Sequence, residues 1–331
     1  MAGINDHTNL ERNIALELVR TTEAAALASA RYLGLGDKEK VDQAAVDAMR
    51  SVLGKISMDG VVVIGEGEKD EAPMLYIGEK IGNGSSPYVD IAVDPVDGTN
   101  LVAKGLPGAI SAIVLSPRDT MNFPAQFVYM NKLVTGEDSK DCVSIEEPVA
   151  VNLKNIAQAK KREISDITVV VLDRPRHEQL ISEIRESGAR IKLITDGDIS
   201  AAIQAAMPET GVDVLMGIGG TPEGVISAAA VKCIGGVIQG KIWPRNDIEL
   251  ALATKAGVDD KVYTTDNLVN SDDVFLAVTG ISSGELLSGV QYSGSIAQTQ
   301  SLVMRSFSGT IRWINSTHNL SRLDKILSHQ Q

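Results

Sequence analysis

The sequence predicts an α/β protein with an α+β N-terminal part and an α/β C-terminal part. Three observations predict it. The chain begins with two helical stretches, and several apolar strands come after them. From about residue 150, strands and helices alternate. Its 331 residues also suit about two domains. We place the division in the charged, turn-rich stretch 136–148, which gives expected domains of residues 1–145 and 146–331.

The N-terminal part is expected to begin with two helices. Residues 11–33 are rich in Ala, Leu and Glu and carry apolar residues at helical spacing, and a second helix runs from about Lys38 to Leu53. A short helix is expected over residues 74–81. The apolar runs predict four strands, of which the last suits an antiparallel sheet: Val61–Ile64, Val89–Val93, Ile110–Leu115 and Phe127–Val134.

The C-terminal part alternates between helices and strands, which is typical of βαβ units and predicts a largely parallel sheet. The expected helices cover residues 152–164, 177–187 and 199–207 and a segment from about Pro222. The expected strands are Ile167–Leu172, Arg190–Ile194 and Val212–Met216, with strand-like runs in the tail at Val274–Thr279, Gln300–Phe307 and Thr310–Asn315.

Composition and charge exclude several classes of protein. Hydrophobic residues make up 44% of the chain and charged residues 22%, which argues against wholesale disorder. The 43 acidic and 31 basic residues give a net charge of −12, which disfavours binding to nucleic acid or to anionic lipid. No basic stretch precedes an apolar core at the N-terminus, and the longest uncharged stretch, residues 286–304, is polar. We therefore expect no signal peptide, no membrane span and a cytoplasmic protein.

The cysteines and histidines do not form a metal motif. Cys142 and Cys233 are too far apart in the sequence for a disulfide framework or a zinc cluster, and we expect both to be structural. The four histidines are scattered, without ligand spacing. His177 is expected on the surface, at the N-terminus of a helix.

An acidic cluster lies between residues 59 and 98, with nine acidic residues and only two basic ones. Glu66 and Asp94 each follow an apolar strand and would point into the crevice beyond the strand ends, where α/β sheets bind ligands. Converging carboxylates repel one another, and a hard divalent cation, Mg²⁺ or Mn²⁺, relieves that repulsion. Two or more such ions suit hydrolysis of a phosphate ester. A solvated acidic loop is the alternative explanation for Glu68, Asp70, Glu71 and Glu79.

The segment Asp94-Pro95-Val96-Asp97-Gly98-Thr99 strengthens this interpretation. Pro95 stiffens the exit from the strand and Gly98 permits an unusual backbone angle, so that Asp94 and Asp97 can face one site. Backbone N–H groups near Gly98 can meet a phosphate if a helix begins there, and the Thr99 hydroxyl would then lie near the attacking water.

This segment resembles the signature of the lithium-sensitive, metal-dependent phosphatase superfamily, which includes inositol monophosphatases and fructose-1,6-bisphosphatases. The run from Gly65 to Lys80 resembles the class II, GlpX-type fructose-1,6-bisphosphatases, including the cyanobacterial dual fructose-1,6-/sedoheptulose-1,7-bisphosphatases. Matching stretches continue over residues 11–318, at Asp173–His177, Asp196–Asp198 and Gly217–Gly224. The resemblance implies a layered αβαβα sugar-phosphatase sandwich.

The resemblance also implies roles for individual residues. The implied metal ligands are Asp42, Glu66, Asp94, Asp97 and Glu223. Asp97 stands where many class II members have Glu, which keeps the charge but shortens its reach. Thr99, paired with Asp42, is the implied activator of the attacking water, and Glu66 completes the catalytic set. The implied substrate contacts are Asp97, Gly98, Thr99, Tyr129, Arg174, Arg176, Asp196, Asp198 and Gly220.

Several of these residues also have an ordinary structural explanation. Arg174 and Arg176 could form surface ion pairs with neighbouring acids, and Asp198 could cap the helix that follows it. Glu223 suits the first turn of a helix. Tyr129 in a strand is more often a core residue, and Asp42 on a helix is more often solvated.

The implied reaction is hydrolysis of the 1-phosphate of fructose 1,6-bisphosphate, in gluconeogenesis or Calvin-type carbon metabolism, with the two arginines holding the 6-phosphate. The nearest alternative is a dual enzyme that also accepts sedoheptulose 1,7-bisphosphate. The alternative of another class is a catalytically silent sugar-phosphate sensor. An inositol phosphatase fits less well, because a monophosphate needs no second anion site. The family further implies a homodimer or homotetramer and AMP as an inhibitor.

Overall fold

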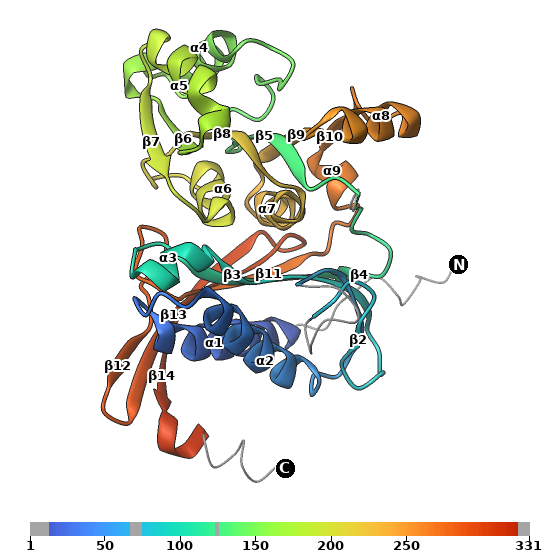
Figure 1. The fold of residues 1–331 in the computed structure, drawn as a ribbon, viewed down its shortest axis with the longest axis vertical. Helices are drawn as coiled ribbons and strands as arrows, with labels where there is room; N and C mark the ends of the chain where they lie inside the picture. The colour runs from blue at the N-terminus through green and yellow to red at the C-terminus, as the bar shows by residue number, and fades with distance from the viewer. Residues whose placement is uncertain (1–12, 67–74, 123–125, 324–331) are drawn as a thin grey trace.

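The structure, a computed structural model, describes residues 13–66, 75–122 and 126–323. Its elements form five layers: helices, an eight-stranded sheet, helices, a six-stranded sheet and helices (Figure 1). The expected αβαβα sandwich is therefore confirmed. The site described below lies where the two sheets face each other across the central layer of helices.

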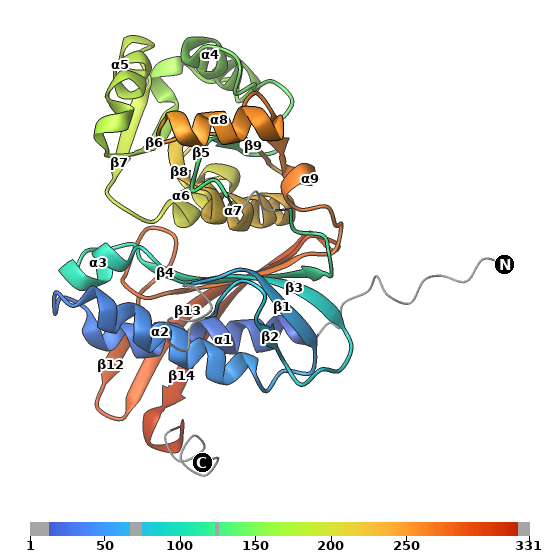
Figure 2. The same ribbon diagram turned by 45° about the vertical axis from the view of Figure 1, so that its right-hand side comes forward.

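The first layer consists of α1 (Ile14–Ser29) and α2 (Lys38–Leu53), which cover the outer face of the eight-stranded sheet (Figure 2). Both were expected from their helical spacing. The α2 helix begins at Asp37, whose side chain accepts a hydrogen bond from the backbone N–H of Lys40 over 3.1 Å. Leu18 of α1 and Val41 and Met49 of α2 are fully buried against the sheet.

The eight-stranded sheet has the order β12-β13-β11-β4-β3-β1-β2, with β14 paired to β13. Leu276 and Val278 of its strand β11 face the central helices, whereas Phe275 and Ala277 face α1 and α2, because successive side chains of a strand point to opposite faces. Its strands are β1 (Asp59–Ile64), β2 (Lys80–Ile81), β3 (Tyr88–Asp97), β4 (Ile110–Pro117), β11 (Phe275–Gly280), β12 (Gln291–Ser293), β13 (Ile296–Arg305) and β14 (Thr310–Asn319).

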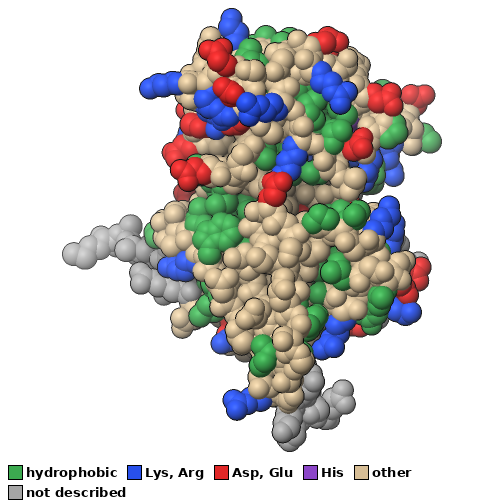
Figure 3. Space-filling view, turned by 90° about the vertical axis from the view of Figure 1, so that its left-hand side faces the viewer, with side chains coloured by type: hydrophobic (Ala, Val, Ile, Leu, Met, Phe, Trp, Pro, Cys, Tyr) green, Lys and Arg blue, Asp and Glu red, His purple; other side chains and the backbone are tan. Residues whose placement is uncertain are grey.

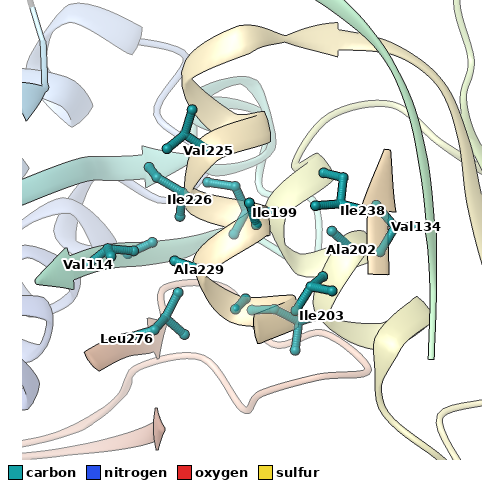
Figure 4. Close-up of a cluster of buried hydrophobic side chains, with 14 of the residues drawn as sticks. Val114, Val134, Ile199, Ala202, Ile203, Val225, Ile226, Ala229, Ile238 and Leu276 are labelled. Carbon is teal, nitrogen blue, oxygen red and sulfur yellow. The ribbon is translucent and has the colours of Figure 1, made fainter. Parts of the chain in front are cut away.

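The central layer is made mainly of α6 (Asp198–Ala206) and α7 (Thr221–Ile234). Figure 4 shows Ile203 and Ala202 of α6 and Ala229 of α7 between Leu276 of the first sheet and Val134 of the second. Every residue of α6 is buried. Because a helix between two sheets has no solvent-facing side, both sequences are largely apolar and rich in Ala.

The six-stranded sheet has the order β10-β9-β5-β8-β6-β7. The expectation of a largely parallel sheet is wrong, because only β6 with β7 and β6 with β8 are parallel, whereas β5 runs antiparallel to both β8 and β9. The antiparallel character of the strand expected at 127–134 is confirmed. The strands are β5 (Tyr129–Thr135), β6 (Thr168–Leu172), β7 (Arg190–Ile194), β8 (Val214–Gly220), β9 (Val237–Ile242) and β10 (Val262–Thr264).

The remaining helices complete the fold. Leu153 of α4 and Ile184 of α5 pack on the outer face of the second sheet, against Val169 and Met216. The α3 helix follows β3 directly and carries part of the site. Their bounds are α3 (Thr99–Lys104), α4 (Val149–Ala159), α5 (Glu178–Glu186), α8 (Asp247–Ala256) and α9 (Thr265–Leu268).

Two further expectations differ from the structure. The division at residues 145 and 146 does not follow the sheets, because β5 precedes it yet belongs to the second sheet, and β11–β14 follow it yet return to the first. The described part of the helix expected at 74–81 holds a turn and the short strand β2, since Lys80 and Ile81 pair with β1.

Charged side chains of both signs lie on the surface. On the face shown in Figure 3, acidic and basic side chains are interspersed over the upper part, so the acidic surplus forms no single-sign patch there. None of the helices in the described ranges is long and apolar enough to cross a membrane.

The central layer generates a stability prediction. Replacement of the fully buried Ile203 of α6 by Ala should lower the free energy of unfolding by about 2–5 kcal/mol, because it leaves a cavity between the two sheets. Urea unfolding followed by circular dichroism measures this change. The matched control is Ile248→Ala on α8, whose side chain is 74% exposed and which should change stability by less than about 0.5 kcal/mol. Equal effects at both positions would contradict a buried central layer.

Candidate active site

The first two carboxylates come from neighbouring parallel strands of the eight-stranded sheet. In the register of β1 and β3, Ile64 lies beside Ala92. Glu66 and Asp94 each follow two residues later, so both stand at the same edge of the sheet. This is the juxtaposition that the two apolar runs predicted.

Asp94 and Asp97 are brought to one side by an irregularity in β3. Asp94 is level with Ala112 of β4, and Asp97 is level with Ile110, so that three steps along β3 match two along β4. A one-residue bulge of this kind shifts the alternation of side chains, and residues three apart then face the same way. Pro95 has no N–H group and so cannot donate a hydrogen bond to a neighbouring strand. The N–H of the next residue, Val96, donates to Asp94 Oδ1 over 3.1 Å.

Gly98 ends the strand in the left-handed region, with φ 98°, and Thr99 is the first residue of α3. The Thr99 hydroxyl donates a hydrogen bond to Asp42 Oδ1 of α2 over 2.8 Å. Asp42 therefore does not sit on a solvated helix face but is tied to the Asp94–Thr99 segment. The charge of nearby Lys38 also acts on Asp42.

The second sheet contributes its carboxylates through the helices of the central layer. Glu223 lies in the first turn of α7, and Asp198 is the first residue of α6. The structure does not support Asp198 as the cap of α6, because its partner is Lys132 and the backbone N–H of Ser200 donates to Asp97 Oδ2 over 3.3 Å. Asp97 thus connects the first sheet to the start of α6.

Asp196 reaches the site from the loop before α6. Its Oδ2 accepts a hydrogen bond from the Asn100 side chain of α3 over 3.0 Å. Its charge acts on Asp42, Asp97 and Glu223, so the seven carboxylates form one electrostatic group. The members of this acidic group are Asp42, Glu66, Asp94, Asp97, Asp196, Asp198 and Glu223.

Burial and mutual repulsion raise the pKa of five of these carboxyl groups. Desolvation raises the pKa of Glu66 to about 7, and the charges of Asp42 and Glu223 add to it. Desolvation followed by the neighbouring carboxylates raises the pKa of Asp94 and Asp97 well above the ordinary range, and burial also raises the pKa of Asp42 and Glu223. None of these five carboxyl groups forms an ion pair with a described basic side chain, so their negative charge is not neutralised by the described part of the protein.

The donor set fits a hard divalent cation. Carboxylate oxygens are the ligands that Mg²⁺ and Mn²⁺ prefer. Glu223 Oε2 is buried and has no hydrogen-bond partner among the described groups, so one oxygen is left for a ligand. Within the ranges that the structure describes, no three Asp, Glu, His or Cys side chains already stand at the spacing of a metal centre. The fit therefore rests on the donor chemistry and on Glu223.

A pocket of about 300 Å³ opens beside the carboxylates. Arg176 donates two hydrogen bonds to the carbonyl of Ile218, at 2.9 and 3.2 Å, and its guanidinium lies 5.1 Å from the centre of the Tyr129 ring. Neither Arg174 nor Arg176 forms an ion pair with a described acidic side chain, so both keep their charge for a ligand. The lining includes Asp97, Tyr129, Arg174, Arg176, Asp196, Asp198, Gly220 and Glu223.

Tyr129 is not an ordinary core residue, since it lines this pocket and meets the Trp243 ring edge-on at 6.1 Å. A Cβ at Gly220 would lie 1.8 Å from Glu223 Oε2, so a larger residue there would displace the Glu223 carboxylate from its present position. The structure thus brings eight of the sequence-predicted residues to one pocket. Asp42, Glu66, Asp94, Gly98 and Thr99 lie on the carboxylate side rather than in its lining.

The expectation of a surface position for His177 is wrong. The side chain is 1% exposed and its Nε2 accepts a hydrogen bond from the N–H of Ile218 over 2.7 Å. Nδ1 must then carry the proton, which it donates to the carbonyl of Leu172 over 2.7 Å. Burial lowers the pKa of His177, in agreement with a neutral ring. His177 therefore bridges β6 and β8 beyond the point where their pairing ends.

Glu79 and the two cysteines have structural roles. Glu79 is buried and forms an ion pair with Arg50 over 2.6 Å, so the solvated-loop alternative does not apply to it. Glu68, Asp70 and Glu71 lie outside the described residues. Burial raises the pKa of Cys233 to about 12, and Cys142 Sγ donates to the Ser139 carbonyl.

Sequence reasoning missed Lys132 and Asn100, and it placed His177 wrongly on the surface. Lys132 had a signal, since it is the one charged residue of β5. Asn100 had none, because its partner Asp196 is 96 positions away.

Comparisons with known proteins show the family to which the chain belongs. The family described as "Bacterial fructose-1,6-bisphosphatase, glpX-encoded" matches residues 12–318. The chain is 43% identical over 330 residues to "Fructose-1,6-bisphosphatase 1 class 2" of Escherichia coli K12 and to "Fructose-1,6-bisphosphatase class 2" of Shigella flexneri, over 95% of this chain and 98% of each relative. Among solved structures, the extragenic suppressor protein suhB from Bartonella henselae matches with a TM-score of 0.33 and 15% identity, over 59% of this chain and 73% of that one.

These matches define the class of the protein as a phosphoric monoester hydrolase. Within that class, the chain belongs to the bacterial, glpX-encoded family of class 2 fructose-1,6-bisphosphatases. Membership implies the use of a divalent metal.

The raised pKa of Glu66 generates a prediction for the metal-free protein. Between pH 4.5 and about 7 the folded state holds a proton on Glu66 that the unfolded state has released. This contribution to stability is fully present below pH 4.5 and is lost as the pH rises through 7. We expect the free energy of unfolding in EDTA to fall from pH 5 to pH 8, and to fall less steeply in Glu66→Gln. Urea unfolding at both pH values tests this; identical slopes in the two proteins would contradict it.

Proposed function

We propose that this chain hydrolyses the 1-phosphate of fructose 1,6-bisphosphate to give fructose 6-phosphate and phosphate, with Mg²⁺ or Mn²⁺ as cofactor. The observation that carries the proposal is an acidic group, suited to cations, beside a pocket lined by two guanidinium groups that form no ion pair with a described acidic side chain, in a member of the fructose-1,6-bisphosphatase family. Such an arrangement suits a sugar with two phosphates. One phosphate meets the carboxylate side and the other meets the arginines.

The metal ligands in this proposal are Asp42, Glu66, Asp94, Asp97 and Glu223. Bound divalent ions, two or more, would activate a water and offset charge on the phosphate and the leaving oxygen. The partial or full burial of the five carboxyl groups supports this role, because it reduces the water that competes for a cation. Asp97 Oδ2 also accepts a hydrogen bond from the backbone N–H of Ser200, which fixes the direction of its carboxylate.

Thr99 and Asp42 are positioned to move a proton. Thr99 Oγ1 already donates to Asp42 Oδ1 over 2.8 Å, so its oxygen can accept a hydrogen bond from an attacking water. Burial raises the pKa of Asp42, which makes it a better base than an exposed aspartate. We assign proton acceptance from water to this pair, with Glu66 as the third catalytic residue.

The sugar and the 6-phosphate occupy the pocket in this proposal. Arg174 and Arg176 hold the 6-phosphate, and the Arg176 guanidinium is kept in place by Tyr129 and the Ile218 carbonyl. The carboxylates of Asp196 and Asp198 accept hydrogen bonds from sugar hydroxyls. Gly220 allows close approach of the backbone, and the segment Asp97-Gly98-Thr99 lies at the reacting phosphate.

Activity on sedoheptulose 1,7-bisphosphate stays a prediction, as do inhibition by AMP and assembly as a homodimer or homotetramer. A catalytically silent sensor is disfavoured by the complete carboxylate set and by the Thr99–Asp42 hydrogen bond.

The test of the function is phosphate release. With Mn²⁺ or Mg²⁺ the protein should release phosphate from fructose 1,6-bisphosphate, and EDTA should abolish the reaction. Glu66→Gln should lower kcat by about 100-fold or more, because it removes one of the charges that hold the cation. Phosphate release from no sugar bisphosphate would overturn the enzyme assignment, and full activity in Glu66→Gln would remove Glu66 from the site.

The 6-phosphate site has its own test. Arg176→Met should raise KM for fructose 1,6-bisphosphate about 10–100-fold and should change the rate on fructose 1-phosphate, which lacks the distal phosphate, by less than about 3-fold. Arg185→Met on α5, outside the pocket lining, is the matched control. Equal losses on both substrates would show that Arg176 does not hold the 6-phosphate.

A further inference from the structure

One buried cation stands among the seven carboxylates of the acidic group. Lys132 projects from the middle of β5, and its side chain is only 2% exposed. Its Nζ donates to Asp198 Oδ2 over 2.5 Å and to the carbonyl of Gly220 over 3.2 Å. Asp198 is 6% exposed, so the ion pair is withdrawn from water on both sides.

The backbone is shaped around this pair. A Cβ on Gly219 would lie 1.9 Å from Asp198 Oδ2 and 2.6 Å from Lys132 Nζ. A Cβ on Gly224 would lie 3.4 Å from Lys132 Cδ, in ordinary contact. The glycine-rich end of β8 therefore gives room for the ammonium group between β5 and the start of α6. A buried lysine is costly unless it is paired, and this one is both paired and hydrogen-bonded.

The choice of partner carries the inference. Asp198 lies close to Asp97 and Glu223. Of the neighbouring charges that act on these two carboxyl groups, that of Asp198 has the largest effect on their pKa. An unpaired carboxylate at this place would join the group that attracts divalent cations. Lys132 compensates Asp198, and it leaves Glu223 Oε2 without a partner.

We propose that Lys132 is a positioning residue that withholds Asp198 from the cation-binding carboxylates and holds it for the sugar hydroxyls. The proposal rests on the function given above for Asp198. It adds that the acidic group serves two ligands, with Asp198 kept for the sugar and the other carboxylates left for the cation. Through the Gly220 carbonyl, the same ammonium group fixes the strand end that lines the sugar pocket.

The division predicts opposite effects on the two ligands. In Lys132→Met the uncompensated Asp198 should raise the affinity for Mn²⁺ about 10-fold, or add a further Mn²⁺ per chain, as measured by calorimetric titration without substrate. The KM for fructose 1,6-bisphosphate should rise about 10-fold or more, with a smaller change in kcat. A merely structural lysine would weaken both ligands together, and that result would overturn the proposal.

Two further variants keep the test decisive. Asp198→Asn leaves Lys132 as an uncompensated cation and should lower Mn²⁺ affinity, which gives the opposite sign even if Lys132→Met fails to fold. The double variant Lys132→Met/Asp198→Asn should return Mn²⁺ affinity to within about 3-fold of the wild type without restoring KM. Unchanged Mn²⁺ affinity in Asp198→Asn would overturn the proposal.

The control is Lys160→Met, which removes a lysine that is 14% exposed and paired with Asp138 and Asp213, away from the pocket lining. It should leave Mn²⁺ affinity unchanged. The Mn²⁺ titrations need no turnover. Absence of phosphate release by the wild type would therefore sink the proposed function, whereas the wrong sign in the titrations would sink the role of Lys132.

Discussion

Repulsion between buried carboxylates is the constraint on which the rest of the structure depends. Asp42, Glu66, Asp94 and Asp97 come from the first sheet and its helices, and Glu223 comes from the central layer. Desolvation and mutual charge raise the pKa of every one of them, so their proximity is held by the folding of the surrounding chain and is compensated by few groups of the protein itself. A packed five-layer core supplies that rigidity. The apolar residues of α6 and α7 fill the space between the sheets, and the first residues of the same two helices carry Asp198 and Glu223.

The same constraint explains how the two halves are joined at the site. Two polar contacts join the β3–α3 segment of the first half to the residues around α6: Asp97 accepts from Ser200 N–H, and Asn100 donates to Asp196. Within the second half, Lys132 connects β5 to the start of α6. Each contact fixes one carboxylate whose direction would otherwise be set by repulsion alone. Rigid placement of charged groups is what allows a site to act on a phosphate without reorganising during the reaction. The neutral His177 has a related part, because its two hydrogen bonds hold β6 and β8 together beside the arginines.

Local sequence patterns predicted the elements that carry the carboxylates at the edge of the first sheet. The apolar runs before Glu66 and Asp94 and the helical spacing of Lys38–Leu53 were sufficient, because those features depend on neighbouring residues. The mixed direction of the second sheet was not predictable in the same way, since the pairing of β5 with β8 joins residues about 80 positions apart. The bulge at Asp94–Asp97 had a local cause in Pro95, yet only the partner strand reveals the shift in register. His177 was misplaced because its burial depends on Ile218, which the chain reaches 41 residues later.

The order of strands in the first sheet also bears on how the molecule is made. The second sheet uses one continuous stretch of chain, residues 129–264, whereas β4 of the first sheet has β11 as its neighbour and waits for a segment that is synthesised more than 150 residues later. On a ribosome, the six-stranded sheet can close while β4 still lacks that neighbour. The apolar face of β4 is then exposed until the last strands emerge. A chain cut short before β11 would therefore leave β4, the neighbour of the strand that carries Asp94 and Asp97, as an unpaired edge strand.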